Sequence, residues 1–178
     1  MKGWAVKMMS KLVDYVDISP HKSVGRKHEI DTITIHHMAG NLTVKQCGRV
    51  FHERKASANY GIDSSGKIAC YVDEKDRSWA TSSASNDNRA ITIEVANNNL
   101  KSWSVSKEAM DSLIKLLVDI CKRHGIKALK WKNNKKLIGN VAVQNMTVHR
   151  WFKATACPGP YLMRKMSYIA RKVNKQLK

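Results

Sequence analysis

Acidic residues are missing from the last third of this 178-residue chain. Residues 121–178 contain 15 Lys or Arg and no Asp or Glu, so residues 1–120 hold the other 17 basic residues and all 14 acidic ones. The formal charge is therefore +15 in the last third and +3 before it. This asymmetry indicates a polyanionic partner, which can be nucleic acid, anionic lipid or a bacterial wall with anionic polymers. A solvated basic face that only aids solubility is the alternative.

Long apolar segments are also missing. No run approaches the roughly 18 apolar residues of a membrane-spanning helix. The segment Met1–Ser10 has no continuous apolar stretch of the roughly 7–15 residues that a secretory signal requires. We therefore expect a chain without a transmembrane segment that is made in the cytoplasm without a signal peptide.

Paired cysteines and linkers are absent as well. The four cysteines, at positions 47, 70, 121 and 157, form no CxxC pair and do not indicate a disulfide framework. The first three have an ordinary interpretation as small buried hydrophobic residues. No repeat or Pro/Gly/Ser-rich linker interrupts the sequence, and 43% of its residues are hydrophobic and 26% charged. This composition predicts one globular domain over residues 1–178.

Periodicity predicts strands interleaved with helices. Alternating or β-branched residues predict strands over residues 31–36, 59–62, 67–72, 90–96 and 146–149. Helical spacing of apolar residues predicts helices over residues 43–51, 106–125 and 161–177. The turn-rich residues 63–66 join two of the strands in a hairpin. The pattern indicates the α/β class, with a central mixed β-sheet flanked by helices. Residues before 30 and residues 137–144 fit no period well.

Two segments carry residues suited to metal chemistry. His36 and His37 end a predicted strand, while His149 ends another and precedes Cys157, which begins a proline-stiffened loop. Imidazole and thiolate are preferred zinc ligands, and a catalytic zinc site needs three protein ligands and an open position. Two histidines and one cysteine meet that requirement. A histidine at a strand end is also a common structural residue, and the His-x7-Cys spacing is not specific by itself.

A wider resemblance makes the signal specific. It rests on four segments, which read Ile-His-His-x-Ala-Gly at 35–40, Ser-Ala-Asn-Tyr-Gly-Ile-Asp-x-x-Gly-Lys-Ile at 57–68, Ile-Thr-Ile-Glu-Val at 91–95 and His-Arg…Thr-Ala-Cys-Pro-Gly at 149–159. In this order they resemble the zinc-dependent N-acetylmuramoyl-L-alanine amidases, which include phage endolysins and peptidoglycan-recognition proteins. The resemblance covers about residues 30–170. It implies hydrolysis of the amide bond between N-acetylmuramic acid and L-alanine in peptidoglycan.

The resemblance also implies the metal ligands. It assigns one zinc ion per chain to His36, His149 and Cys157. Adjacent side chains of a strand point to opposite faces, so only one of His36 and His37 faces the site, and we favour His36. Receptors of the same fold that have lost catalysis commonly carry Ser in place of the cysteine. Cys157 therefore favours an enzyme over a non-catalytic peptidoglycan receptor.

Two further residues are candidates for catalysis. Glu94, within an apolar strand, is the candidate proton carrier for the attacking water and the leaving amine, unless it is a solvated residue at an edge. Tyr60 matches a family tyrosine whose hydroxyl faces the metal and can donate a hydrogen bond to the developing oxyanion. The alternative for Tyr60 is a core aromatic side chain between strands.

Other matched positions depart from the family or give weak signals. Thr155 stands where some phage relatives carry a lysine that assists the oxyanion, although Lys153 is near. Asn59 replaces a histidine that is common in relatives. Trp79 and Asn88 fall in the segment that lines the glycopeptide groove in relatives, and with Thr155 they are weak candidates for substrate contact.

We therefore expect a phage or prophage endolysin that leaves the cytoplasm by another route and lyses the wall. The basic last third is expected to hold it on anionic wall polymers. A competing hypothesis is a nucleic-acid-binding protein that uses the basic residues for phosphates and Trp131 and Trp151 for base stacking. No recognised nucleic-acid-binding signature supports that hypothesis, and it leaves His36, His149 and Cys157 without a role.

Overall fold

Six strands form a central mixed sheet in the computed structural model, which describes residues 8–178. In spatial order they are β1 (Tyr15–Val16), β5 (Ile68–Cys70), β4 (Tyr60–Ile62), β7 (Ala90–Val95), β3 (Thr32–His37) and β8 (Met146–Thr147). Only β4 and β5 are antiparallel, and the other neighbours are parallel. A separate two-stranded sheet pairs β2 (Lys22–Ser23) with β6 (Arg77–Ser78). The prediction for Met1–Ser10 lies mostly outside the described residues.

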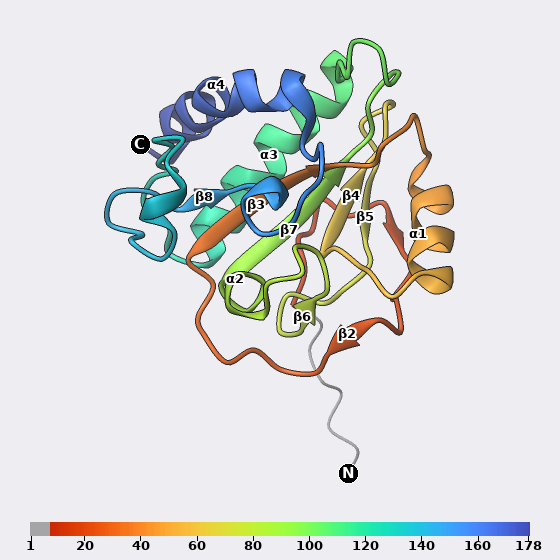
Figure 1. Ribbon diagram of the computed structural model, residues 1–178, viewed down its shortest axis with the longest axis horizontal. Coiled ribbons are helices and arrows are strands. Elements are labelled where there is room, and N and C mark those ends of the chain that lie inside the picture. The colour runs from red at the N-terminus through yellow and green to blue at the C-terminus, as the bar shows by residue number, and fades with distance from the viewer. Residues whose placement is uncertain (1–7) are drawn as a thin grey trace.

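Helices cover both faces of the sheet (Figure 1). They are α1 (Val44–Glu53), α2 (Ala84–Arg89), α3 (Lys107–Arg123) and α4 (Gly159–Leu177), with short 3-10 helices η1 (Lys135–Leu137) and η2 (His149–Trp151). Helices α3 and α4 pack against each other over one face, and α1 lies against the other near β4 and β5. No helix within residues 8–178 has the length and apolar content needed to cross a bilayer.

Local signals set the helix ends. Thr43 forms a capping box with Gln46 at the start of α1, and the Ser106 hydroxyl accepts a hydrogen bond from the Ala109 N–H at the start of α3. Gly125 follows α3 with φ +66°, the left-handed conformation that commonly ends a helix. These signals explain why the sequence predicts both helices within a few residues of their true bounds.

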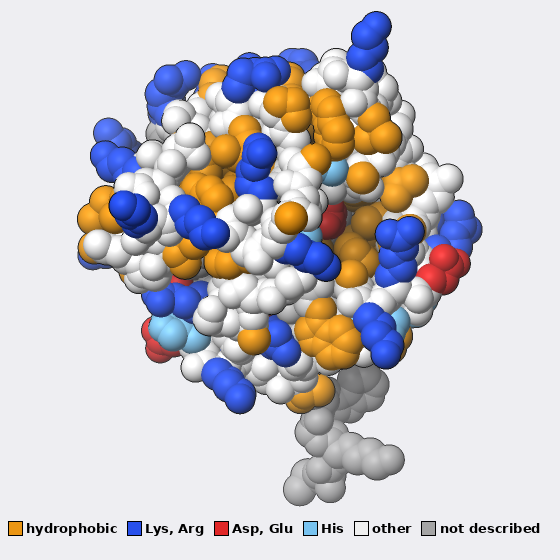
Figure 2. Space-filling view, viewed as in Figure 1, with side chains coloured by type: hydrophobic (Ala, Val, Ile, Leu, Met, Phe, Trp, Pro, Cys, Tyr) orange, Lys and Arg blue, Asp and Glu red, His pale blue; other side chains and the backbone are white. Residues whose placement is uncertain are grey.

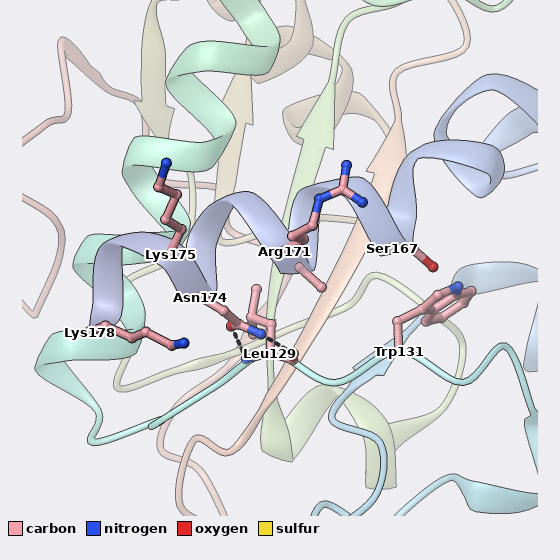
Figure 3. A pocket seen from close by; sticks show the side chains of 8 residues that line it. Leu129, Trp131, Ser167, Arg171, Asn174, Lys175 and Lys178 are labelled. Atoms are coloured by element: carbon pink, nitrogen blue, oxygen red, sulfur yellow. Dashed lines mark hydrogen bonds between the residues drawn. The ribbon is translucent and has the colours of Figure 1, made fainter.

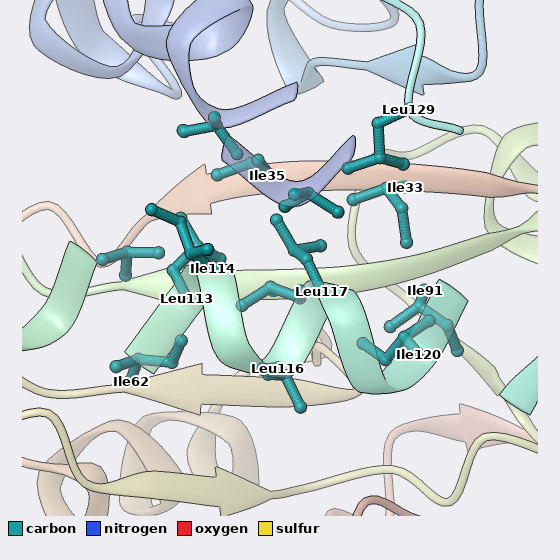
Figure 4. Close-up of a cluster of buried hydrophobic side chains, with 14 of the residues drawn as sticks. Ile33, Ile35, Ile62, Ile91, Leu113, Ile114, Leu116, Leu117, Ile120 and Leu129 are labelled. Carbon is teal, nitrogen blue, oxygen red and sulfur yellow. The ribbon is translucent and has the colours of Figure 1, made fainter. Parts of the chain in front are cut away.

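The two faces of the sheet differ in chemistry. Strands β3 and β7 are parallel. The neighbouring pairs include Ile33 and Ile91, Thr34 and Thr92, Ile35 and Ile93, and His36 and Glu94. The isoleucines face α3 and α4 and form the main hydrophobic core (Figure 4). The threonines, the histidine and the glutamate face the other way. Successive side chains of a strand point to opposite faces of the sheet. The pairing of β3 with β7 therefore puts the apolar core on one face of these two strands and the polar site on the other.

The predicted fold class is confirmed, because the sheet is mixed, is flanked by helices and contains the expected hairpin. Strand β7, predicted from its β-branched residues, lies inside the sheet between β4 and β3. Several boundaries differ from the predictions: the last strand ends at Thr147, His149 begins the 3-10 helix η2, and the last helix begins at Gly159. The six-residue helix α2 was not predicted, since its polar sequence has no helical apolar pattern.

Candidate metal centre and active site

Three side chains from distant parts of the chain converge at one end of the central strands. His36 lies near the end of β3, His149 opens η2 directly after β8, and Cys157 lies in the loop before α4. Each offers one ligand atom, and the three atoms lie within 4.8 Å of one another. The sequence predicted this trio, and the fold brings all three together.

The geometry leaves donor atoms free to coordinate a cation. The Cys157 Sγ lies 3.4 Å from Nδ1 of His36, and the rings of His36 and His149 have centroids 5.0 Å apart. The Nε2 atoms of both histidines are buried without a hydrogen-bond partner. The nitrogen beside the thiol is Nδ1 of His36, and two imidazoles and a thiol that converge in this way fit a soft N/S metal site.

Burial sets the protonation of these groups. It lowers the pKa of His36 well below its usual range, helped by the neighbouring His149, and it lowers the pKa of His149. Both rings are therefore neutral near pH 7, the form that binds a metal. Burial raises the pKa of the Cys157 thiol, and the charge of Glu94 raises it further. A bound cation stabilises the thiolate and opposes that shift.

Backbone groups fix the position of Cys157. Its thiol interacts with the His37 backbone N–H, and its own N–H donates to the Thr155 hydroxyl over 3.2 Å. Gly159 follows with φ +78°, and a Cβ there would approach the Trp103 ring to 2.9 Å. Glycine is therefore required where the chain turns into α4. Thr155 thus orients the cysteine backbone, and its role in substrate contact stays a prediction.

His37 lies outside the trio. Its ring packs edge-on against Trp103 with centroids 4.6 Å apart, and its Nδ1 accepts a hydrogen bond from the Ala39 N–H over 2.7 Å. Burial lowers the pKa of His37 to about 4. The alternation of β3 thus gives the two adjacent histidines different environments, with His36 in the metal centre and His37 in its wall.

Glu94 lies beside the trio on the polar face of the sheet. Its Oε1 is 3.8 Å from Nδ1 of His36, and its Oε2 is buried without a partner. Burial raises the pKa of Glu94 to about 8. A hollow in the surface exposes acidic and histidine side chains among hydrophobic ones (Figure 2). A carboxyl group that exchanges a proton near neutral pH is suited to acid/base chemistry.

The prediction that the Tyr60 hydroxyl faces the metal is wrong. Tyr60 pairs with Ile93 in the sheet, whereas Gly61 pairs with Glu94, so the tyrosine points to the opposite face. Its hydroxyl donates to Glu74 over 2.5 Å and accepts from the Ser10 N–H over 2.9 Å. Burial, with the nearby Glu74, raises its pKa. Tyr60 is the core aromatic that was the alternative interpretation.

Tyr71 is a residue that sequence reasoning missed. A Cβ at Gly61 would lie 2.5 Å from the Tyr71 ring, so this ring packs over the strand position that pairs with Glu94. The Tyr71 hydroxyl donates to the Val44 carbonyl over 2.6 Å. Alternation along β5 places Ala69, and therefore Tyr71, on the face opposite Cys70. This alternation in the sequence could have predicted the face on which Tyr71 lies.

Trp79 and Asn88 have different surroundings. Trp79 lines a pocket of about 280 Å³ with Lys55 and Arg77, and its Nε1 donates to the Ser23 hydroxyl over 3.0 Å. The Asn88 amide donates to the Ala84 carbonyl over 2.8 Å and accepts from the Lys27 N–H over 3.0 Å. Asn88 therefore holds the end of α2 to the preceding loop and does not line this pocket.

Three N/S donors beside a carboxyl group in a surface hollow are typical of a mononuclear metal hydrolase. The family model described as N-acetylmuramoyl-L-alanine amidase matches residues 26–160. The chain belongs to the N-acetylmuramoyl-L-alanine amidase family. Its activity is that of an amidase, and its substrate class is peptidoglycan.

Solved structures share the fold. The endolysin LysCS, an N-acetylmuramoyl-L-alanine amidase from Clostridium intestinale URNW, is 17% identical with a TM-score of 0.65, over 91% of this chain and 96% of that one. A mutant endolysin from Bacillus subtilis is 16% identical with a TM-score of 0.64, over 90% and 99%. The Ph2119 endolysin from a Thermus scotoductus MAT2119 bacteriophage is 13% identical with a TM-score of 0.57, over 85% and 89%. A search of curated proteins found no match.

Proposed function

We propose that this amidase depends on one zinc ion held by His36, His149 and Cys157. The observation that carries the proposal is the convergence of their three donor atoms within 4.8 Å. The Nε2 atoms of His36 and His149 are buried without a partner, but Nε2 of His37 is too, so the convergence of the donor atoms and not the missing partners singles out this trio. Two imidazoles and one thiolate form a known ligand set of catalytic zinc.

Zinc bound there supplies an activated water and polarises the amide carbonyl of the substrate. The protein must still move protons. Glu94 faces the trio from the neighbouring strand, and its unpaired Oε2 can accept a proton from water and return one to the leaving amine. Burial raises the pKa of Glu94 to about 8 in the metal-free site, and the charge of a bound zinc would lower it from there, towards a range in which the carboxyl group can both take up and release a proton.

We further propose an endolysin role, in which the enzyme lyses the wall after synthesis in the cytoplasm. Family membership supports the cleavage of the amide bond, and three of the structurally similar proteins are endolysins. The charge of +15 on residues 121–178 supports a second contact with anionic wall polymers. No specific nucleic acid is part of this proposal, because Trp131 and Trp151 stack on each other with centroids 5.1 Å apart.

The zinc assignment is tested by elemental analysis of the purified protein. We expect one zinc per chain in the wild type, none in His149→Ala, and full zinc in the control His52→Ala, whose exposed ring pairs with Asp17. Incubation with peptidoglycan should release new N-terminal L-alanine amines, and a chelator should stop the release. Cleavage at a glycosidic or cross-bridge bond would contradict the function.

A further inference from the structure

A pocket lies between α4 and residues 129–131 (Figure 3). Its volume is about 600 Å³, larger than the pocket beside Trp79. The pocket is lined by Leu129, Trp131, Ser167, Ala170, Arg171, Asn174, Lys175 and Lys178. No acidic residue is among them.

Residues 129–131, which form the side of the pocket opposite α4, are fixed by side-chain contacts. The Asn174 side chain accepts from the Leu129 N–H over 2.7 Å and donates to the Leu129 carbonyl over 2.8 Å, as the dashed lines in Figure 3 show. Trp131 stacks on Trp151 with an interplanar angle of 5°. The pocket is therefore built by specific contacts between segments distant in the sequence.

One face of α4 supplies the charge. Arg171, Lys175 and Lys178 are spaced at i, i+4 and i+7, which places them on one side of a helix. None of the three forms an ion pair with a carboxylate of residues 8–178. The Arg171 guanidinium lies over the Tyr168 ring, 5.7 Å from its centroid, whereas the like charges of Arg171 and Lys175 at i, i+4 destabilise the helix. The helix dipole favours a cation in the last turn, which accounts for Lys178 at most.

The position of the pocket separates it from catalysis. Helix α4 begins at Gly159, two residues after Cys157, and Arg171 lies twelve residues further along. At about 1.5 Å per residue, this places Arg171 roughly 18 Å along the helix from its start. A ligand held by Arg171, Lys175 and Lys178 therefore lies away from Cys157, while Trp131 links the pocket to η2 through its stacking on Trp151.

We propose that this pocket binds the phosphodiester-linked polyol chain of anionic wall polymers. Arg171, Lys175 and Lys178 would neutralise successive phosphates, and Trp131 would supply an apolar surface for the carbon chain between them. The choice of a wall polymer rests on the proposed function, since a peptidoglycan amidase works where such polymers are attached. A nucleic acid fits less well, because Trp151 already covers one face of the Trp131 ring.

The test compares two double variants that remove the same charge. Arg171→Gln/Lys175→Gln changes the pocket, and Lys135→Gln/Lys136→Gln changes exposed residues of η1 that do not line it. Binding of purified poly(glycerol phosphate) is measured over a range of salt concentrations. We expect the pocket double to bind about tenfold more weakly, with a salt slope smaller by roughly 1.5 to 2, and the η1 double to stay within about threefold of wild type. Trp131→Leu should also weaken binding, at unchanged charge.

Equal losses in the two double variants would overturn the proposal, because the attraction would then be diffuse. Single-stranded DNA of equal length that binds as tightly, with the same loss in the pocket double, would overturn it in favour of nucleic acid. Turnover of a soluble muropeptide without polymer is measured in parallel and should be the same in the pocket double and wild type. If wild type does not cleave that muropeptide, the proposed function fails, while the polymer-binding result still decides the role of the pocket.

Discussion

The Sγ atom of Cys157 lies 3.4 Å from Nδ1 of His36, although the two residues are 121 positions apart in the chain. The contact joins the end of a central strand to the loop that leads into α4. The His149 ring lies beside that of His36, with centroids 5.0 Å apart, and its Nε2 is buried without a partner. The thiol and the two neutral imidazoles together form a ligand set that a soft metal ion can bind once the thiol is deprotonated.

Cys157→Ser is expected to lose zinc and turnover together. Changes to groups that merely support a metal ligand cost about 10–100-fold, so loss of a ligand should cost more than about a hundredfold. Chelator should lower the Tm of the wild type, because zinc binds only the folded state, and should leave the Tm of Cys157→Ser unchanged. Cys121→Ala, a change in the α3 core, should keep its zinc. A fully zinc-loaded Cys157→Ser protein would contradict the ligand assignment.

Glu94→Gln is expected to keep zinc but lose activity. Acid/base catalysis by a positioned side chain contributes about 10²–10⁴-fold, and the amide is of nearly the same size as the carboxyl group. The measurement is kcat on peptidoglycan fragments together with zinc content. Glu108→Gln, at an exposed position in the first turn of α3, serves as the control with the same chemical change. If Glu94→Gln retains wild-type kcat, another group carries the proton.

Tyr60→Phe is expected to lower stability and leave catalysis unchanged. The change removes a buried hydroxyl that donates to Glu74 and accepts from the Ser10 N–H. Unpaired buried partners cost about 1–3 kcal/mol, which urea unfolding can measure. The hydroxyl lies on the face of the sheet opposite Glu94, so kcat should stay within about twofold. A large loss of kcat with unchanged stability would restore the catalytic role that the family resemblance implied.

The sequence correctly predicted the site residues whose motif and strand alternation agree. It was wrong where the motif and the alternation disagree about the face to which a side chain points. His36 and Glu94 both follow from alternation in β3 and β7, because each strand carries isoleucines on one face and polar residues on the other. The same rule, applied along the hairpin, places Tyr60 with the isoleucines and Tyr71 with Glu94. The motif resemblance implies a catalytic Tyr60, whereas the alternation indicates the core position that was the alternative interpretation.

The pocket beside α4 was beyond prediction for a different reason. The charge of the last third was evident, but the pocket depends on the pairing of Asn174 with Leu129, 45 positions away, and no local pattern encodes such a contact. The stacking of Trp131 on Trp151 is likewise tertiary. Long-range side-chain contacts of this kind follow from the fold and not from periodicity.

Lysis of whole walls is expected to weaken as salt rises, whereas cleavage of soluble muropeptides should stay nearly constant. The basic last third attracts anionic polymers over distances that salt screens, with a Debye length of about 10 Å at 0.1 M. Turbidity loss of purified walls, followed from low to high ionic strength, measures the first quantity. Walls stripped of anionic polymers are the control and should show a flat response. Equal salt dependence on both kinds of wall would rule out the electrostatic contact.

Because of the buried Glu74, the free energy of unfolding is expected to decrease as the pH falls into the acid range. Burial alone would raise its pKa, but hydrogen bonds from Arg123, His124 and Tyr60 outweigh burial and lower the pKa to about 2. The folded protein therefore binds fewer protons than the unfolded chain between about pH 4.5 and pH 2. Stability from Glu74 is fully present above about pH 4.5 and is lost as pH falls towards 2, by on the order of 2–3 kcal/mol.

Urea unfolding of wild type and Glu74→Gln at several pH values measures this contribution. The variant should be less stable near pH 6, because it leaves Arg123 with one fewer charged partner. The difference between the two proteins should then shrink as pH falls through 4.5 towards 2. Glu108→Gln, at an exposed position, should run parallel to wild type over the same range. A difference between wild type and Glu74→Gln that does not change with pH would show that Glu74 stabilises the fold by packing and not as a carboxylate.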